Sequence, residues 1–233
     1  MNFFSRFVGT FFDPGKTFKA LAARPVWLDA LVILLILVSL YTFLINPVAQ
    51  KDSLRMMEDN AAKLKDKWGE EGYNRYLDRI KGGNRVLASF LLAPLTYLIG
   101  FLFSALIFLG IGRLTATQGN YVQVFSLLVH ANFVDKFLGN ALRLFLVSSR
   151  QSVFQTSTGL AALFPRLEVT STLYGVLYQV DFFQLWLFGI LGIGLASVFK
   201  ISVRKALIIS YGFWVLKSLL SLGLYLMQMR VFQ

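Results

Sequence analysis

Apolar residues along this chain gather into five blocks separated by polar segments. The blocks are Trp27–Ile45, Val86–Gly112, Tyr121–Val147, Phe182–Phe199 and Ala206–Met229. A helix of about 20 predominantly apolar residues crosses the roughly 30 Å hydrocarbon core of a bilayer. Blocks of this length predict an all-α polytopic membrane protein, with a five-helix transmembrane bundle within a membrane domain over residues 27–233.

The first 26 residues predict two short amphipathic helices ahead of this domain. Apolar residues recur there at i, i+3, i+4 and i+7, which is one face of a helix: Phe4, Phe7, Val8 and Phe11. Asp13 is placed to cap the second helix, with Pro14 at its first position. Phenylalanines beside lysine and arginine favour an interfacial location on the membrane. The alternative is a cytosolic segment that packs on the ends of the spans.

Two polar segments interrupt the blocks. Residues 46–85 form a polar loop with two apolar stretches at helical spacing, separated by Gly69 and Gly72. This pattern predicts a helix–break–helix unit, which serves either as a structural cap or as a docking surface for a partner. Residues 148–180 contain a shorter apolar face broken by Pro165, which fits either a second surface helix or a shallow re-entrant piece.

Composition supports a membrane protein. The chain is 56% hydrophobic and 15% charged, with a mean hydropathy of +0.63. Its formal net charge of +11 is more typical of residues that flank spans and meet anionic lipids than of nucleic-acid binding, because no basic stripe lies on a water-facing element. We therefore expect membrane lipids as partners, together with other membrane proteins or a second copy of the chain, and no nucleic acid.

The short segments between spans set the expected orientation. Lysine and arginine concentrate in residues 1–26, 113–120 and 200–205, which predicts a cytoplasmic N-terminus. Five spans then place the C-terminus, including Gln233, on the outer side together with Glu70 in the long loop. The nine basic residues of that loop, partly offset by seven acidic ones, oppose this orientation.

Several chemistries are excluded by residue type. The chain has no cysteine and a single histidine, so thiolate catalysis, thiolate metal sites and multi-histidine metal sites are ruled out. No carboxylate pair and no nucleophile–base set is visible in the sequence. We expect no enzyme, no cofactor and no metal.

The third block is unusual because it carries many polar groups. On a helix at 100° per residue these fall within one sector of about 140°, and they are Asn132, Asp135, Lys136, Gly139, Asn140 and Arg143. Charges that face hydrocarbon are costly, so this face is expected to point into the bundle. The segment is a candidate intramembrane polar site.

Lys217, midway along the fifth block, is the expected partner of this site. Counted from the predicted span starts, Asp135 and Lys217 lie at similar depths, which predicts an ion pair between them. Arg143 is expected either to reach the interface or to meet Glu168 or Asp181 on the outer side. These charges either hold helices together or line a polar cavity. His130 is expected to serve in hydrogen-bonded packing.

The second half of the chain resembles a known family. The stretch "DFFQLWLFGILGIGLASVFKISVRKALIISYGFWVL" (Asp181 to Leu216) looks like the last two spans of bacterial Yip1-domain proteins, with their "D-x-F-x-x-W" entry, glycine-rich span and short basic turn. "TQGNYVQVFSLLVHA" and "FFDPGKTFKAL" resemble the family's third-span entry and N-terminal helix start. The resemblance implies five membrane helices, a cytosolic N-terminus and, for a bacterial member, residence in the inner membrane.

Two functions are consistent with these features. One is a non-catalytic membrane protein of the Yip1 type that organises the membrane or binds lipid and protein partners. The other is a small transporter, lipid flippase or channel that uses the polar face of the third span. The first predicts that the surface segments matter most, and the second that the buried charges do.

Overall fold

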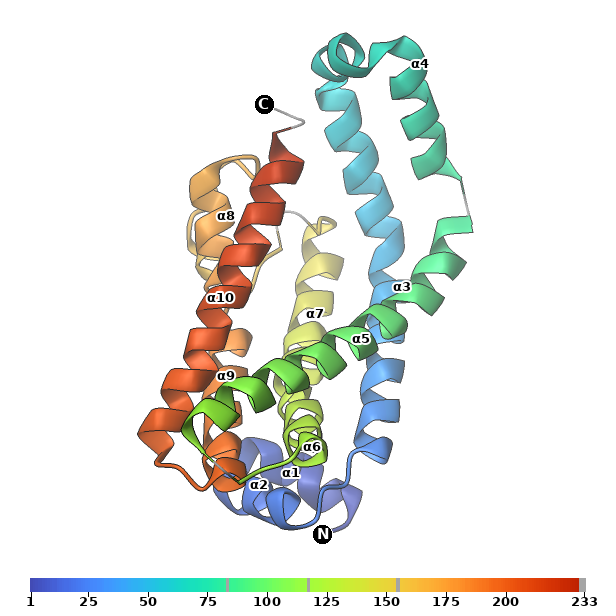
Figure 1. The fold of residues 1–233 in the computed structure, drawn as a ribbon. Coiled ribbons are helices and arrows are strands. Elements are labelled where there is room, and N and C mark those ends of the chain that lie inside the picture. The colour runs from blue at the N-terminus through green and yellow to red at the C-terminus, as the bar shows by residue number, and fades with distance from the viewer. Residues whose placement is uncertain (83, 117, 154–155, 231–233) are drawn as a thin grey trace. The chain divides into compact units, whose positions relative to one another are not determined.

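Helices are the main secondary structure in the residues that this computed structural model describes, which are 1–82, 84–116, 118–153 and 156–230. Figure 1 shows the helices in chain order. They are α1 (Phe3–Phe12), α2 (Pro14–Ala23), α3 (Leu28–Asp59), α4 (Ala61–Lys81), α5 (Asn84–Thr115), α6 (Tyr121–Ala131), the π-helical segment η1 (Val134–Gly139), α7 (Asn140–Arg150), the 3₁₀ turn η2 (Leu160–Leu163), α8 (Thr172–Gln179), α9 (Phe182–Phe199) and α10 (Val203–Met229).

The chain divides into two compact units. Unit 1 comprises Met1–Ser39, Ala93–Ala141 and Phe182–Lys217. Unit 2 comprises Leu40–Leu92, Leu142–Asp181 and Ser218–Gln233. Unit 1 contains the larger apolar core and most of the candidate site residues, so it is described first.

Four helices are long and apolar enough to cross a membrane: α3, α5 over Phe90–Thr115, α9 and α10. They correspond to four of the five predicted spans, and α9 has the predicted bounds. The third predicted span is helical too, but it is divided. It consists of α6, the η1 segment and α7, with a turn at Asn132. An all-helical membrane fold is confirmed, whereas the fifth span stays a prediction.

Polar side chains fix the helix starts at the N-terminus. Asn2 caps α1 by accepting a hydrogen bond from the Ser5 amide at 2.8 Å. Asp13 caps α2 by accepting one from the Lys16 amide at 3.2 Å, and Pro14 occupies the first turn. Both groups occupy their preferred positions at a helix start. The sequence prediction for Asp13 and Pro14 is confirmed.

Helix α9 is the centre of unit 1. It packs against α2, α6 and η1, and its glycines let these neighbours approach. A Cβ at Gly194 would lie 3.1 Å from Leu127 and 3.2 Å from Phe18, and one at Gly192 would lie 2.7 Å from Leu207 of α10. The small-residue face predicted for this span therefore serves close helix packing.

The α6–η1 segment runs antiparallel to α9. Gly119 lies against Phe199, and Leu127 lies against Gly194. Farther along, Lys136 and Gln184 line one common crevice. In these three pairs the residue number increases along α6–η1 and decreases along α9. The two elements therefore run side by side for most of the length of α9.

One end of unit 1 collects several helix termini, with α1 and α2 beside them (Figure 1). The last turn of α5 lies against the end of α9, because a Cβ at Gly112 would lie 2.1 Å from the Phe199 ring. The start of α6 lies beside the α2–α3 connection, where Gln123 and Ser126 donate hydrogen bonds to the carbonyls of Ala22 and Val26. We call this the α2 end of unit 1.

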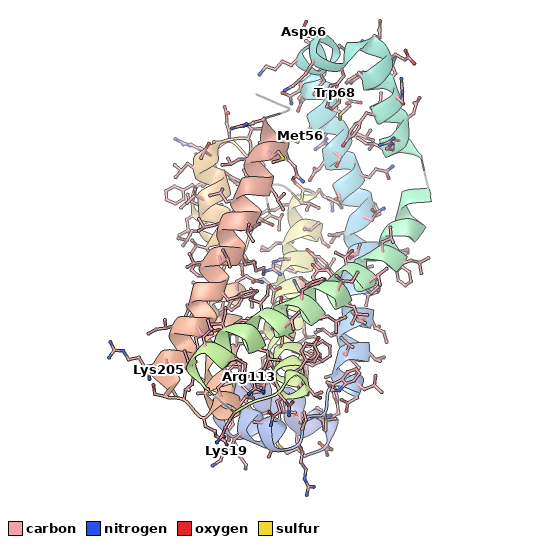
Figure 2. The ribbon with its side chains drawn as sticks, viewed as in Figure 1. Lys19, Met56, Asp66, Trp68, Arg113 and Lys205 are labelled. Carbon is pink, nitrogen blue, oxygen red and sulfur yellow. The ribbon has the colours of Figure 1, made fainter. Side chains whose placement is uncertain are left out.

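Unit 2 differs from the predicted polar loop in its boundaries. Helix α3 continues through Pro47 to Asp59, so the first half of the loop extends the first span. The chain then breaks at Asn60 and kinks at Gly69, which has a φ of +74° that favours glycine. Gly72 stays helical. Met57, Leu64, Tyr73 and Ile80 form a separate small core in this hairpin, whose outer end carries Met56, Asp66 and Trp68 in Figure 2.

The described residues between α7 and α9, 151–153 and 156–181, contain two short helical pieces rather than one continuous helix. They contain η2 and α8, while a β-bridge joins Gly159 to Asp181. Buried Asp52 of α3 accepts hydrogen bonds from the Ser152 hydroxyl at 2.9 Å and the Val153 amide at 2.5 Å. An aspartate within the extension of the first span thus holds the segment that follows α7.

Candidate functional site: a polar crevice in unit 1

The polar residues of the third predicted span point largely inward. Asn132, Asp135 and Asn140 are buried, and the Lys136 side chain is 14% exposed. Phe137 in the same segment is exposed. The burial fits the expectation that polar side chains avoid hydrocarbon.

The π-helical segment changes which residues share a face. The Asn140 amide donates to the Asp135 carbonyl, five residues back, which widens the turn. The Asn132 side chain donates to the Leu128 carbonyl at 2.8 Å and so helps satisfy the backbone where the helix is interrupted. A wheel at 100° per residue therefore does not hold through η1. Such π segments occur often at functional sites.

Asp135 and Lys136 form an ion pair, with Asp135 Oδ2 2.5 Å from Lys136 Nζ. The Lys136 ammonium also lies 4.6 Å from the centroid of the Tyr97 ring on α5. Such a cation–π contact is strongest where water is excluded. Together the carboxylate and the ring fix the position of the Lys136 ammonium.

Lys217 of α10 points to the neighbouring helix α9. Its ammonium donates to Gln184 Oε1 at 2.9 Å and lies 5.7 Å from the centroid of the Phe188 ring. The ion pair between Asp135 and Lys217 stays a prediction. The structure places both residues in unit 1 and brings Lys217 and Lys136 to the same crevice.

This crevice has a volume of about 260 Å³. Five elements line it, and the lining residues of α5, α9 and α10 follow helical spacing on one face. The lining includes Thr96, Tyr97, Gly100 and Ser104 of α5, Leu128 and Asn132 of the α6 end, Lys136 of η1, Gln184 and Phe188 of α9, and Phe213 and Lys217 of α10.

The crevice opens at the surface of unit 1. Thr96, Gly100 and Lys217 are exposed, whereas Leu128 and Phe188 on the inner side are buried. Gly100 faces open space, since a Cβ there would meet nothing within 4 Å. Because α5 and α10 are apolar helices of membrane-spanning length, we expect an opening between them to face lipid.

Its polar groups lie at one depth. Lys136, Gln184 and Lys217 are each 14 or 15 residues from the α2 end of unit 1, counted from Tyr121, Phe199 and Val203. At 1.5 Å per residue this corresponds to roughly 21–23 Å. If the α2 end is at one interface, that distance places the crevice within the hydrocarbon core but only about 7–9 Å from the opposite interface, beside the first turn of α9.

Arg143 and Asp181 belong to unit 2. Arg143 Nη2 lies 3.1 Å from Asp181 Oδ2, and Arg143 Nε donates to the Thr158 hydroxyl at 3.0 Å. Thr158 itself donates to Asp181. Glu168 is exposed. Arg143 thus secures the segment after α7 and is not among the residues that line the crevice.

A second charged cluster was not predicted as a unit. Arg6 of α1 is only 5% exposed. Its guanidinium donates to the Met1 carbonyl at 2.8 Å, to the Asp29 carboxylate at the start of α3, and to His130 Nε2 at 3.3 Å. His130 Nε2 accepts this bond, so the proton of the ring is on Nδ1, which donates to the Ser126 carbonyl at 2.8 Å.

The same helix contacts η1 through aromatic rings. The centroid of the Phe7 ring lies 5.1 Å from that of Phe133 and 5.2 Å from that of Phe137. These two residues lie on either side of the Asp135–Lys136 ion pair in the chain. Phe4 is 70% exposed. The apolar face predicted for this helix is therefore split. Phe3, Phe7 and Phe11 pack against the core of unit 1, whereas Phe4 points away from it, and the location of this helix at the membrane stays a prediction.

Metal binding finds no support in the described part of the chain, where no group of three or more histidine, aspartate or glutamate side chains is placed to hold an ion. What the geometry defines is a helical membrane protein with a side-open polar crevice.

Comparison with known proteins gives the family. The chain matches the Yip1 domain over residues 8–225 and belongs to that family. No curated protein and no solved structure matches the chain significantly.

Proposed function

We propose that this Yip1-family protein is a non-catalytic, five-span membrane protein that binds the polar head of a membrane lipid in the crevice of unit 1. The observation that carries the proposal is the placement of two lysines in a crevice whose mouth lies between two apolar helices. A charged opening toward hydrocarbon is costly unless a polar ligand occupies it.

Chain direction supports the fifth span. Helices α5 and α9 both finish at the α2 end of unit 1, where Gly112 meets Phe199. The chain between them must therefore travel away from that end before α9 begins. Because α6–η1 runs beside α9 for most of the length of α9, this segment is expected to cross the membrane where α9 does, which supports α6, η1 and α7 as the third of five spans.

Charge supports a cytoplasmic α2 end. Basic side chains gather there, and Figure 2 shows Lys19, Arg113 and Lys205 at the same end of unit 1. Cytoplasmic segments next to spans carry an excess of lysine and arginine. With five spans the C-terminus is then on the outer side, although Gln233 itself lies outside the described residues. A bacterial inner membrane is the setting that the family resemblance suggests.

Single-cysteine labelling tests this topology in a chain that has no cysteine. Both Gln118 and Arg166 are exposed and flank the third span. We expect Gln118→Cys to react with a membrane-impermeant thiol reagent from the cytoplasmic side only, and Arg166→Cys from the other side only. Arg24→Cys and Glu70→Cys serve as the matched inner and outer references. Reaction of Gln118→Cys and Arg166→Cys from one side would exclude the fifth span.

Filling the crevice should displace its ligand. We expect Gly100→Phe to insert a ring into the open space beside Gly100 and to reduce the lipid retained by the purified protein by about tenfold or more, which corresponds to about 1.4 kcal/mol of lost binding. Gly110→Phe is the matched control, because Gly110 is also exposed on α5 with open space around it. Native mass spectrometry of both variants from nanodiscs measures retained lipid. Equal retention would contradict the proposal.

Transport is the alternative function of the same crevice. A head group bound there would lie about 7–9 Å below the nearer interface, and entry to that depth is also a first step in lipid translocation. Reconstituted vesicles with a fluorescent lipid separate the two functions. We expect the protein to bind lipid without raising the rate of lipid exchange between leaflets. An increase in that rate that Gly100→Phe removes would establish a translocation pathway instead.

A further inference from the structure

We infer that the crevice selects a singly charged phosphodiester, the head group of an anionic phospholipid, over a zwitterionic one. This inference rests on the proposed lipid-binding function and adds the chemical class of the ligand.

The charge balance of the crevice favours one negative charge. Lys136 and Lys217 contribute two positive charges to the lining, and the Asp135 carboxylate at 2.5 Å from Lys136 offsets one of them. The residues that line the crevice include no aspartate or glutamate. A phosphodiester anion therefore meets two ammonium groups in the lining, whereas an ammonium or choline group would meet the same two cations and no carboxylate in the lining.

The hydrogen-bonding groups fit a phosphate ester. Each lysine ammonium has three N–H donors, and one donor of Lys217 goes to Gln184 Oε1. With that oxygen accepting, the Gln184 amide nitrogen presents donors. Hydroxyl groups of Thr96 and Ser104 also line the crevice. Charge-assisted hydrogen bonds to phosphate oxygens are about twice as strong as neutral ones.

Size and access indicate that the phosphate belongs to a lipid. The volume of about 260 Å³ lies below the roughly 300–1,000 Å³ of sites that enclose drug-sized ligands, so a head group fits and a whole phospholipid does not. The mouth at Thr96 and Gly100 lies on an apolar helix. Acyl chains can remain in the bilayer while the head group enters from the side.

The test uses the full chain in nanodiscs of phosphatidylcholine with increasing phosphatidylglycerol, followed by native mass spectrometry of retained lipids. We expect retention of phosphatidylglycerol to exceed that of phosphatidylcholine by about tenfold at equal abundance. Lys217→Gln should abolish this preference, whereas Lys205→Gln, an exposed charge at the start of α10, should leave it unchanged. Water-soluble glycerophosphoglycerol, the deacylated form of this lipid and also a singly charged phosphodiester, is added in a parallel arm to test for a soluble source of the same ester.

The outcomes are separable. If the two lipids are retained equally and Gly100→Phe abolishes retention of both, the selectivity is overturned and the proposed function stands. Retention that Gly100→Phe does not change overturns the proposed function itself. Displacement of phosphatidylglycerol by millimolar glycerophosphoglycerol overturns the lipid source. If Lys217→Gln fails to fold, the lipid titration of the unsubstituted protein and the charge-conserving Lys217→Arg, which should keep the preference, decide the question.

Discussion

Replacing Asp135 with asparagine is expected to lower the free energy of unfolding by about 3 kcal/mol, since removal of one partner of a buried ion pair costs about 3–5 kcal/mol and an isolated cation at mid-span about 2.5–3.5 kcal/mol. Asp135 is fully buried and lies 2.5 Å from the Lys136 ammonium. The asparagine leaves that ammonium next to a neutral amide. Thermal and denaturant unfolding in detergent micelles measure the change.

A double-mutant cycle assigns the partner of Asp135. Asp135→Asn combined with Lys136→Met should destabilise by less than the sum of the single changes, because the double variant leaves no uncompensated charge. The same cycle with Lys217→Met tests the ion pair predicted from sequence. Additive effects in both cycles would mean that Asp135 is stabilised by other groups. A folded double variant that has lost lipid shows that these charges bind ligand, and one that retains lipid shows that they only hold helices together.

Replacing Arg6 with methionine is expected to release α1 from unit 1. The guanidinium joins Met1, Asp29 and His130, and hydrogen bonds to charged groups contribute about 1.5–3 kcal/mol. We expect hydrogen exchange across Phe3–Phe12 to rise by about tenfold or more. Exchange in η1 should rise with it, because the Phe7 ring lies against Phe133 and Phe137 on both sides of the Asp135–Lys136 pair.

Two phenylalanines of α1 provide a matched comparison. Phe7→Ser removes the ring that contacts η1, whereas Phe4→Ser changes a ring that is 70% exposed. Phe7→Ser should raise exchange in both α1 and η1, and Phe4→Ser should leave η1 unchanged while weakening attachment of α1 to the membrane surface. Unchanged protection of α1 after Phe7→Ser would show that its apolar face does not hold it.

The sequence predicts the apolar helices well because their signal is strong. The bounds of α9 follow from a run of apolar residues between Asp181 and Lys200. The cap at Asp13 follows from the adjacent proline. By contrast, the sequence places the end of the first helix too early, because the polar residues after Asn46 resemble a loop. A helix that faces water is polar as well, so polarity alone does not mark the end of α3. Helix continuity depends on where the chain breaks, and the breaks are at Asn60 and Gly69.

The crevice was only partly predictable. The cost of charge in hydrocarbon predicts that the polar face with Lys136 is buried and that Lys217 contributes to the same site. The π-helical turn does not, because the choice between five-residue and four-residue spacing depends on packing against α1 and α9. Gln184 and Tyr97 were missed since each is a lone polar group in an apolar span. The spacing of Thr96, Gly100 and Ser104 at i, i+4 and i+8 is the signal that would have marked this face of α5.

Arg6 was missed for a similar reason. In the sequence it counts only as one of the basic residues of segment 1–26, because the sequence does not show that α1 packs its Arg6 side toward His130. Once the two helices lie together, the single histidine and the start of α3 supply an acceptor and a carboxylate for the guanidinium.

The distance between lipid phosphorus and the lysine ammonium groups tests the central claim most directly. Solid-state ³¹P–¹⁵N dipolar recoupling measures it in the ¹⁵N-lysine protein embedded in phosphatidylglycerol bilayers, with Lys136→Arg and Lys217→Arg to assign the signals. Lipid bound in the crevice predicts ¹⁵Nζ–³¹P distances of about 3–4 Å for Lys136 and Lys217, as for an ammonium that donates to a phosphate oxygen, and their loss in Gly100→Phe. Dephasing confined to interfacial lysines such as Lys19 and Lys205 would contradict it.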